Sequence, residues 1–285
     1  MFLKIFFFEE VRKVHIQPYI LNDSSHCDHE KRAISIAKKL VSLGYKPTII
    51  QIATPAKTRY LKIRDIHRKY GDGVNVVYSE DKGNRALWNT IVKTLEGTHA
   101  MTLSSTIKYD DLEQFVFDCE EFFKKNDGIF CGHIRGISFF DYRKLQDFET
   151  IEGQKCSPFF TLLCACIPYQ FVHEIGPIDS YNVYGKYIEY FLVLNCFSCD
   201  IPVVMDYRHS YFILNKVKSK KKYSELGKKW LYSFGLEDTL KSFSKYLKQF
   251  TYSYSYSGKK EIVDDFEEFI EIEEGEHEEA EGNNT

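Results

Sequence analysis

The chain has 285 residues, 44% of them hydrophobic, and its 38 basic and 41 acidic side chains give a net charge of −3. This length allows one large α/β domain with appendages, or two small domains, with a sizeable buried core. No apolar run reaches the ~18–20 residues that a membrane-spanning helix needs, so the sequence excludes a helical membrane span.

The charge is unevenly distributed along the chain. Residues 264–285 carry 11 acidic side chains and no Lys or Arg, which leaves 38 − 30 = +8 on the rest. A basic body suits an anionic ligand such as a nucleotide diphosphate. We expect the low-complexity acidic tail, residues 251–285, to be disordered. An acidic arm that shields the basic body, or an edge strand at residues 252–257, is the alternative.

The first residues and the cysteines indicate the cellular compartment of the protein. The opening stretch MFLKIFFFEE is short and is interrupted by Glu9 and Glu10, which favours a β-strand over a signal peptide. Eight cysteines lie in apolar or mixed surroundings without a regular framework, which favours free thiols in a reducing compartment. Cys196 and Cys199 have the spacing of a zinc pair, but no second pair accompanies them. We therefore expect a cytoplasmic protein.

The first half of the chain alternates between strand and helix patterns. The expected elements are a strand at 14–21, a helix at 29–43, a strand at 47–52, a helix at 58–70, a strand at 74–78, a turn at 82–84, a helix at 85–95 and a strand at 100–103. Alternation at this spacing predicts a mostly parallel central sheet flanked by helices, with right-handed crossovers and ligands at its carboxyl edge.

The second half is less regular. We expect a helix at 112–125, a strand at 128–133, an irregular substrate-side stretch at 135–155, an apolar strand at 159–167, a short helix at 169–175, a turn at 176–179, a helix at 186–197 and a strand at 202–207. Two further helical segments, around 223–234 and 237–250, follow. The predicted organisation is a domain at 1–215, a helical extension at 216–250 and the tail.

Several local motifs occur in the order found in one enzyme family. Pro18 and Tyr19 stand in the first predicted strand and Asn22 directly follows it. Asp81-Lys82-Gly83-Asn84 follows the third strand, with Asn89 in the next helix. The stretch FVHEIGPID at 171–179 and Tyr184-Gly185 come later. Over residues 14–212 the chain resembles a family 2 glycosyltransferase of the GT-A (nucleotide-diphospho-sugar transferase) fold.

The resemblance implies a nucleotide-sugar donor, either a UDP- or a GDP-sugar, and a glycan or protein acceptor. The positions that it assigns to donor binding are Tyr19, Asn22, Ala53, Lys82, Gly83, Asn84, Asn89, Ser104, Ser105 and Thr106. In the family a divalent ion on an Asp-x-Asp neutralises the diphosphate, and a carboxylate deprotonates the acceptor.

This chain departs from the family at the acidic positions. The Asp-x-Asp falls on Ser104-Ser105-Thr106, and the Asp expected after the second strand falls on Ala53. The Gly-Glu-Asp-x-Asp stretch that holds the base retains only Glu189. Without these carboxylates, neither the metal site nor the catalytic mechanism of the family can be carried over directly to this chain. Three interpretations of the site stay open.

In the first interpretation the enzyme is active and uses cations in place of a metal: Lys82, Lys186, Arg208, Lys216 and Lys218. The catalytic base is then Glu189 or Asp179. In the second, Mn²⁺ or Mg²⁺ binds at Asp110-Asp111 with His209, and Thr106 is a further weak ligand, although the two aspartates more simply cap the helix that starts at Leu112. In the third, the domain is a catalytically inactive binding or scaffold module.

A nucleic-acid-binding module is the hypothesis from another class. It rests only on the basic body and the many aromatic residues, which fall mainly in apolar strands and so belong to the core. No RNA-binding signature is present, and we expect no nucleic-acid partner. The lysine run at 216–222 is a solvated face or, alternatively, a phosphate or peripheral membrane contact.

Overall fold

The computed structural model describes residues 13–22, 27–52, 68–135, 150–151, 154–156, 160–182, 187–199, 201–214 and 229–235. The expectations for the first residues, for the acidic tail and for most of the helical extension lie outside these ranges. Within them, no helix is long and apolar enough to cross a bilayer.

The first half of the chain forms the parallel part of the sheet. Strands β1 (Ile16–Asn22), β2 (Thr48–Ile52), β3 (Asn75–Ser79) and β4 (His99–Ser104) lie in the order β3-β2-β1-β4, and all neighbouring pairs are parallel. Helices α1 (Cys27–Ser42) and α3 (Gly83–Thr94) connect strands of this set. This part of the fold agrees with the alternation seen in the sequence.

The second half makes the sheet mixed, which corrects the expectation of a mostly parallel sheet. Strand β9 (Cys164–Pro168) runs antiparallel between β4 and β6 (Ile129–Arg135), and β10 (Val203–Ile213) runs parallel to β6. The short strands β5 (Ile107–Lys108) and β8 (Gln154–Cys156) pair antiparallel with β10, and β7 (Thr150–Ile151) pairs with β8. A buried apolar run indicates that a strand is covered on both faces, but it carries no information on direction.

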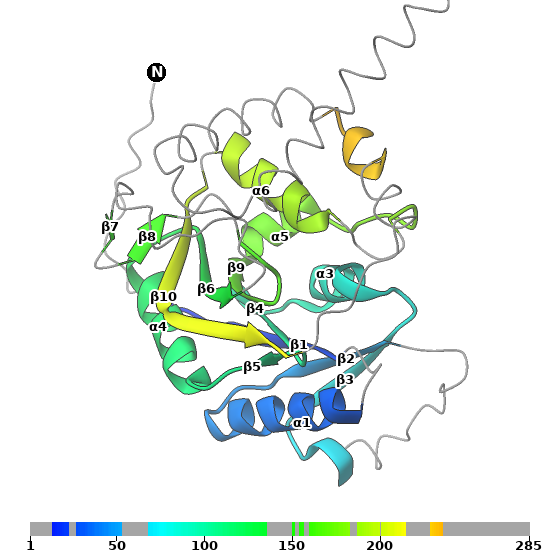
Figure 1. Ribbon diagram of the computed structural model, residues 1–285, viewed down its shortest axis with the longest axis vertical. Helices are drawn as coiled ribbons and strands as arrows, with labels where there is room; N and C mark the ends of the chain where they lie inside the picture. The colour runs from blue at the N-terminus through cyan, green and yellow to red at the C-terminus, as the bar shows by residue number, and fades with distance from the viewer. Residues whose placement is uncertain are drawn as a thin grey trace, which may run out of the picture.

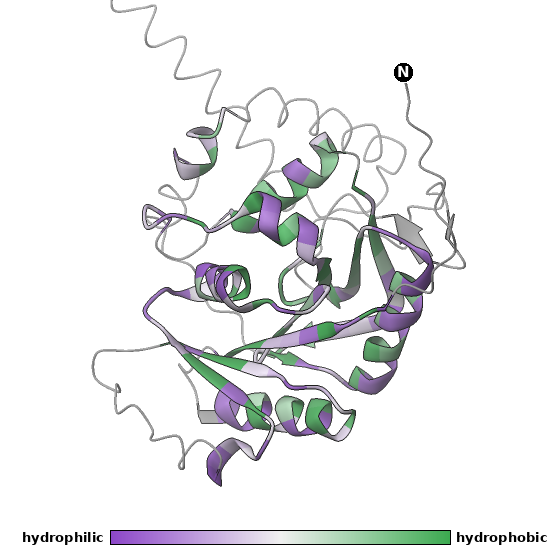
Figure 2. Cartoon of the chain, turned by 180° about the vertical axis from the view of Figure 1, so that it is seen from behind, coloured by the Kyte–Doolittle hydropathy of each residue, from purple (hydrophilic) through white to green (hydrophobic). Residues whose placement is uncertain are grey.

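Helices cover both faces of the sheet (Figure 1). Helices α1 and α4 (Leu112–Lys125) contribute to one apolar cluster, and α3, α5 (Tyr169–Ile175) and α6 (Ile188–Ser198) contribute to the other. Figure 2 shows the hydrophobic residues concentrated along the strands and on parts of the helices. The result is a three-layer α/β/α arrangement, in which α1 and α4 bury one stripe while α6 is apolar on most sides.

The sheet topology brings the ends of β1 and β4 together. Leu21 of β1 is in register with Ser104 of β4, and the Ser105 amide donates to the Leu21 carbonyl at 2.9 Å. In open α/β sheets, ligands bind outside the carboxyl ends of the parallel strands. The edge formed by the ends of β1 and β4 is therefore the expected place for a ligand.

Candidate functional site

In the turn after β4, Ser104, Ser105 and Thr106 carry hydroxyl groups at the positions where family 2 glycosyltransferases have the carboxylates of Asp-x-Asp. The Ser104 and Thr106 hydroxyls lie 2.8 Å apart and bond to each other, and the Ser104 amide donates to the Tyr109 hydroxyl. Mg²⁺ and Mn²⁺ need charged or multiple oxygen ligands. Neutral hydroxyls that already bond to one another do not meet this need, so this turn does not fit a divalent metal ion.

Three side chains around this turn have buried polar atoms without partners. Asn22 donates through Nδ2 to Gln51 at 2.7 Å but its Oδ1 accepts nothing, and the buried Ser105 Oγ has no partner. Arg32 of α1 donates through Nε to the Ser105 carbonyl at 2.7 Å, while its buried Nη2 is unpaired. Arg32 was not among the residues singled out from the sequence, since a cation on an amphipathic helix reads as a solvated position.

Helix α3 holds the segment after α5 through three buried side chains. Asn89 donates to the Ile178 carbonyl at 2.9 Å and accepts from the Ile178 amide at 2.8 Å. Trp88 Nε1 donates to the Gly176 carbonyl at 2.8 Å. Arg85 pairs with Asp81 and donates to three carbonyl groups of the same segment, those of residues 179, 180 and 182. Asn89 therefore positions the protein's own backbone.

The rest of the Lys-Gly-Asn turn lies at the start of α3. Lys82 is the exposed N-cap residue, with no side-chain capping bond, and Gly83 has a φ of 54°, in the left-handed region that favours glycine. Asn84 is half-buried. Because Arg85 links Asp81 to the segment at 179–182, this turn and that segment lie next to each other.

The two predicted bases have different surroundings. Asp179 is exposed, and its Oδ1 accepts from the Tyr181 amide at 2.9 Å, as in an Asx turn. Glu189 at the start of α6 accepts through Oε1 from the Thr161 hydroxyl at 2.5 Å and from the Leu162 amide at 2.7 Å. The contacts of Glu189 join α6 to the segment before β9, while Asp179 faces solvent.

Of the remaining predicted donor and diphosphate positions, only Tyr19 and Arg208 lie among the described residues, and both lie away from this edge. Tyr19 is fully buried in the core, its hydroxyl lies 3.1 Å from the Thr94 hydroxyl, and burial raises its pKa to about 12. Ala53, Lys186, Lys216 and Lys218 lie outside the described residues. Arg208 lies in a separate network on the α4 face.

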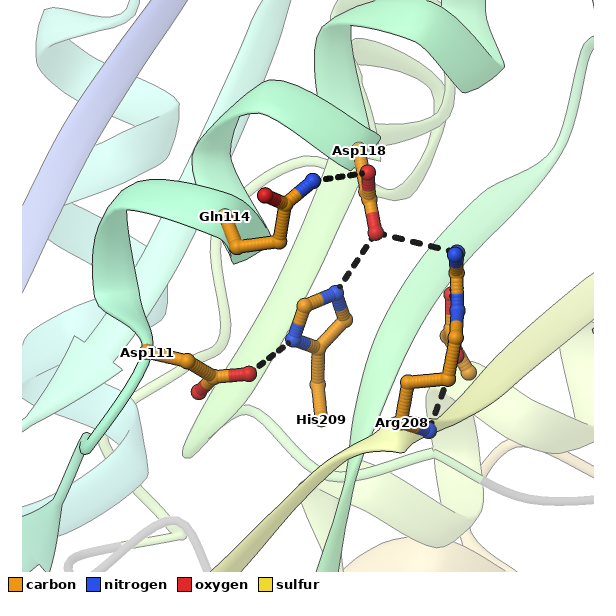
Figure 3. A network of polar contacts seen from close by, with 6 residues as sticks. Asp111, Gln114, Asp118, Arg208 and His209 are labelled. Carbon is orange, nitrogen blue, oxygen red and sulfur yellow. Dashed lines mark hydrogen bonds and ion pairs between the residues drawn. The ribbon is translucent and has the colours of Figure 1, made fainter.

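That network surrounds His209 in the middle of β10 (Figure 3). His209 is 1% exposed, its Nδ1 lies 2.6 Å from Asp111, and its Nε2 lies 2.9 Å from Asp118 of α4. Arg208 pairs with Asp206 and contacts Asp118 at 2.9 Å. The pairing of β10 with β6 shifts register between Asp206 and Ser210, which indicates a bulge that carries Arg208 and His209.

Within this network the positive charge of Arg208 lies against the carboxylates of Asp206 and Asp118. Burial raises the pKa of Asp206, but hydrogen bonds and charge from Arg208 outweigh it, and the net pKa lies below the ordinary value. The pKa of Arg208 is raised, chiefly by the same carboxylate. Ligand atoms of Asp118, Asp206 and His209 lie within 4.8 Å of one another, as in a metal site. Arg208 already contacts both carboxylates, so a metal ion would have to displace it.

Two of the residues that the second interpretation names are in contact in the structure. Asp111 and His209 do come together, and although Asp111 is the N-cap residue of α4, its side chain makes no capping bond. Asp110 instead pairs with Lys108 on the surface. Sequence reasoning missed Asp118 and Asp206, because nothing in their local pattern marks them as neighbours of His209.

Comparison with known proteins rests on structure alone. No protein-family model matches the chain, and no curated protein matches its sequence. Among the solved structures similar to it is the crystal structure of GalNAc-T7 with UDP, GalNAc and Mn²⁺, at 12% identity and a TM-score of 0.61. The match covers 90% of this chain and 54% of that chain, so this protein spans about half the length of its neighbour.

A second similar structure is that of a mycobacterial protein. It has 12% identity and a TM-score of 0.48, and the match covers 77% of this chain and 73% of that one. No argument depends on it. The likeness to GalNAc-T7 shows that this chain has the GT-A-like fold of glycosyltransferases, and at this identity it shows the fold alone.

Proposed function

We propose that this protein is a glycosyltransferase that transfers a sugar from a nucleotide-sugar donor to a hydroxyl acceptor. The observation that carries the proposal is the GT-A-like fold with the β4 turn, Ser104 to Thr106, beside the end of β1. Its structural neighbour GalNAc-T7 was solved with UDP and GalNAc, which supports a UDP-sugar as donor. The motifs at 81–84 and 171–179 extend the proposal to a family 2 type of enzyme that acts on a glycan or protein.

The donor would lie at the carboxyl edge of β1, β2 and β4, and the acceptor beside the segment that α3 holds. The contacts of Arg85 support this pairing of subsites, because they place residues 179–182 next to the turn at Asp81. Asp179 is the base that we propose. Its side chain is exposed on a backbone fixed by Arg85 and Asn89, so a carboxylate would meet an incoming hydroxyl in a defined position.

In this reaction the carboxylate of Asp179 takes the proton of the acceptor hydroxyl, whose oxygen bonds to the anomeric carbon. The bond from that carbon to the diphosphate breaks, and the nucleoside diphosphate leaves with the electron pair. Glu189 has a positioning role, because its Oε1 already accepts two hydrogen bonds from the segment before β9. No step uses a metal ion, since the turn after β4 does not fit one.

The experiment that tests the function is a measurement of nucleoside diphosphate release from UDP- and GDP-sugars with simple glycan acceptors. The full chain should release a diphosphate with at least one donor. Asp179→Asn keeps the acceptor oxygen for the Tyr181 amide and removes the base, so it should lower kcat by about 10²–10⁴. The matched control is Glu174→Gln, an exposed acid on α5 whose loss should leave kcat unchanged.

Three outcomes would contradict the proposed function or the role of Asp179. Binding of sugar nucleotides without release would favour a catalytically inactive module, which the loss of carboxylates after β4 would then explain. Equal kcat values for the Asp179→Asn and Glu174→Gln variants would remove Asp179 from the mechanism. A chain that binds no sugar nucleotide is not a glycosyltransferase.

A further inference from the structure

Arg32 is a half-buried cation that has no counterion among the described residues. Its Nε donates to the Ser105 carbonyl, its Nη2 is buried without a partner, and no carboxylate pairs with it among the residues that the structure describes. The nearest acids along α1 are engaged elsewhere, because Asp28 lies 3.8 Å from Lys31 and Glu30 lies 2.5 Å from Lys69. A positive charge that is partly removed from water without an opposite charge beside it is unfavourable.

Two fully buried polar atoms without partners accompany this cation. They are Ser105 Oγ, on the residue whose carbonyl Arg32 contacts, and Asn22 Oδ1, at the end of β1. Both residues are 0% exposed, and the bond from the Ser105 amide to Leu21 keeps the two chain segments together. Six buried side-chain atoms lack partners in the described part of the chain, and half of them belong to this group.

The chemistry of these atoms defines what would satisfy them. Arg32 Nη2 is a donor, Ser105 Oγ can donate or accept, and Asn22 Oδ1 only accepts. An anionic oxygen suits the guanidinium and the hydroxyl, because charge-assisted hydrogen bonds to phosphate are strong and match the shape of an arginine. Asn22 Oδ1 requires a donor such as a ligand hydroxyl or N–H. A ligand that carries a phosphate and a protonated polar group meets both requirements.

We infer that Arg32 binds the diphosphate of the nucleotide donor and replaces the divalent metal that the turn after β4 does not fit. The inference rests on the proposed function and deepens it, since it names the residue that neutralises the leaving group. Ser105 adds a hydrogen bond to the same phosphate, and Asn22 accepts one from the ribose or the base. Arg32 is a cation from α1, apart from the lysines and Arg208 that sequence reasoning named.

The test is calorimetric binding of pyrophosphate, UDP and GDP to the full chain in the presence of EDTA. Arg32→Gln should weaken UDP binding by about ten- to hundredfold, the effect of one hydrogen bond to a charged group. Lys38→Gln is the matched control, because it removes an equal charge from an exposed position on the same helix and should change affinity less than twofold. Ser105→Ala should weaken binding by a few-fold.

Thermal unfolding without ligand separates this role from a structural one. Arg32→Gln removes the bond from Nε to the Ser105 carbonyl, so Tm should fall slightly under either role. A variant that stays folded at the assay temperature and loses UDP affinity supports the inference, whereas a fall in Tm large enough to unfold the variant would make Arg32 structural and overturn it. Equal UDP affinity in the wild type and Arg32→Gln would overturn the inference and leave the proposed function standing. Arg32-dependent binding of pyrophosphate without any nucleotide binding would support the anion site and refute the glycosyltransferase. Absence of binding to all three ligands would refute both.

Discussion

Replacement of Asn89 by alanine should loosen the segment that carries Asp179. The amide of Asn89 bonds to both the amide and the carbonyl of Ile178, which is 6% exposed, so the variant leaves two buried backbone groups unpaired. Each such group costs about 1–3 kcal/mol, and two give about 2–6 kcal/mol. The third bond, to Asp81, adds little because Asp81 keeps its pairing with Arg85.

Urea-induced unfolding followed by circular dichroism measures this loss of stability. Asn195→Ala is the matched control, because that amide makes one local bond to the Phe191 carbonyl inside α6, and its loss should cost about 1 kcal/mol or less. Activity gives a second readout. A loosened segment at 176–182 should raise KM for the acceptor more than KM for the donor.

The reasoning is refuted if Asn89→Ala and Asn195→Ala lower the free energy of unfolding by the same amount. Such a result would mean that water or a backbone shift pairs the Ile178 groups in the variant. A larger rise in KM for the donor than for the acceptor would place Asn89 in the donor site, as the family resemblance implies.

Three further outcomes are expected. Arg208→Gln should raise the pH of acid unfolding, measured by circular dichroism, because the depressed pKa of Asp206 supplies stability above its unfolded pKa that is lost as the pH falls through the folded value; an unchanged midpoint would contradict this. Gly128→Ala should lower the free energy of unfolding, measured in urea, by more than about 2 kcal/mol, because φ is 118° and a Cβ would lie 2.4 Å from the Pro202 carbonyl oxygen. The control Gly44→Ala has open space around the new Cβ and should lower the free energy of unfolding by only about 1 kcal/mol. Addition of Mn²⁺ to the ligand-free chain should leave Tm unchanged, since Arg208 and His209 already contact the buried carboxylates; a rise in Tm that depends on Mn²⁺ concentration would establish a metal centre there.

Much of the fold is predictable because it follows from local periodicity. The helix predicted at 112–125 and the short helix at 169–175 have the observed bounds, and the four parallel strands fall within two residues of their predicted ends. The direction of β9 was not predictable, since its buried residues, Cys164 to Ile167, are compatible with either orientation. Strands β5, β7 and β8 have two or three residues each, too few to show a period.

Strand β10 shows why the polar network escaped prediction. The sequence predicts a strand at 202–207, but the strand continues to Ile213 across the register shift between Asp206 and Ser210. The shift breaks the alternation of apolar and polar residues on which strand prediction depends. His209 was singled out by its type, while its contact with Asp118 joins residues 91 positions apart and no local pattern reports it.

The structure brings together two of the chain segments at which the sequence places the candidate site. The family motifs indicate the ends of β1 and β4 and the turn before α3, and the structure brings the first two together in register. The residues that remain unpaired there are a different set, because pairing depends on tertiary contacts. Asn89 bonds to backbone, whereas Arg32, on a helix that the sequence marks only as amphipathic, has a buried Nη2 without a hydrogen-bond partner.

The most direct test of the central claim is the affinity of the full chain for UDP measured twice, once with EDTA and once with excess Mn²⁺. An edge that neutralises a diphosphate with its own cations should bind UDP with the same Kd in both conditions. Binding that occurs only with Mn²⁺ would contradict the proposed metal-independent site, and the absence of binding in both conditions would contradict the proposal that the protein is a UDP-sugar transferase.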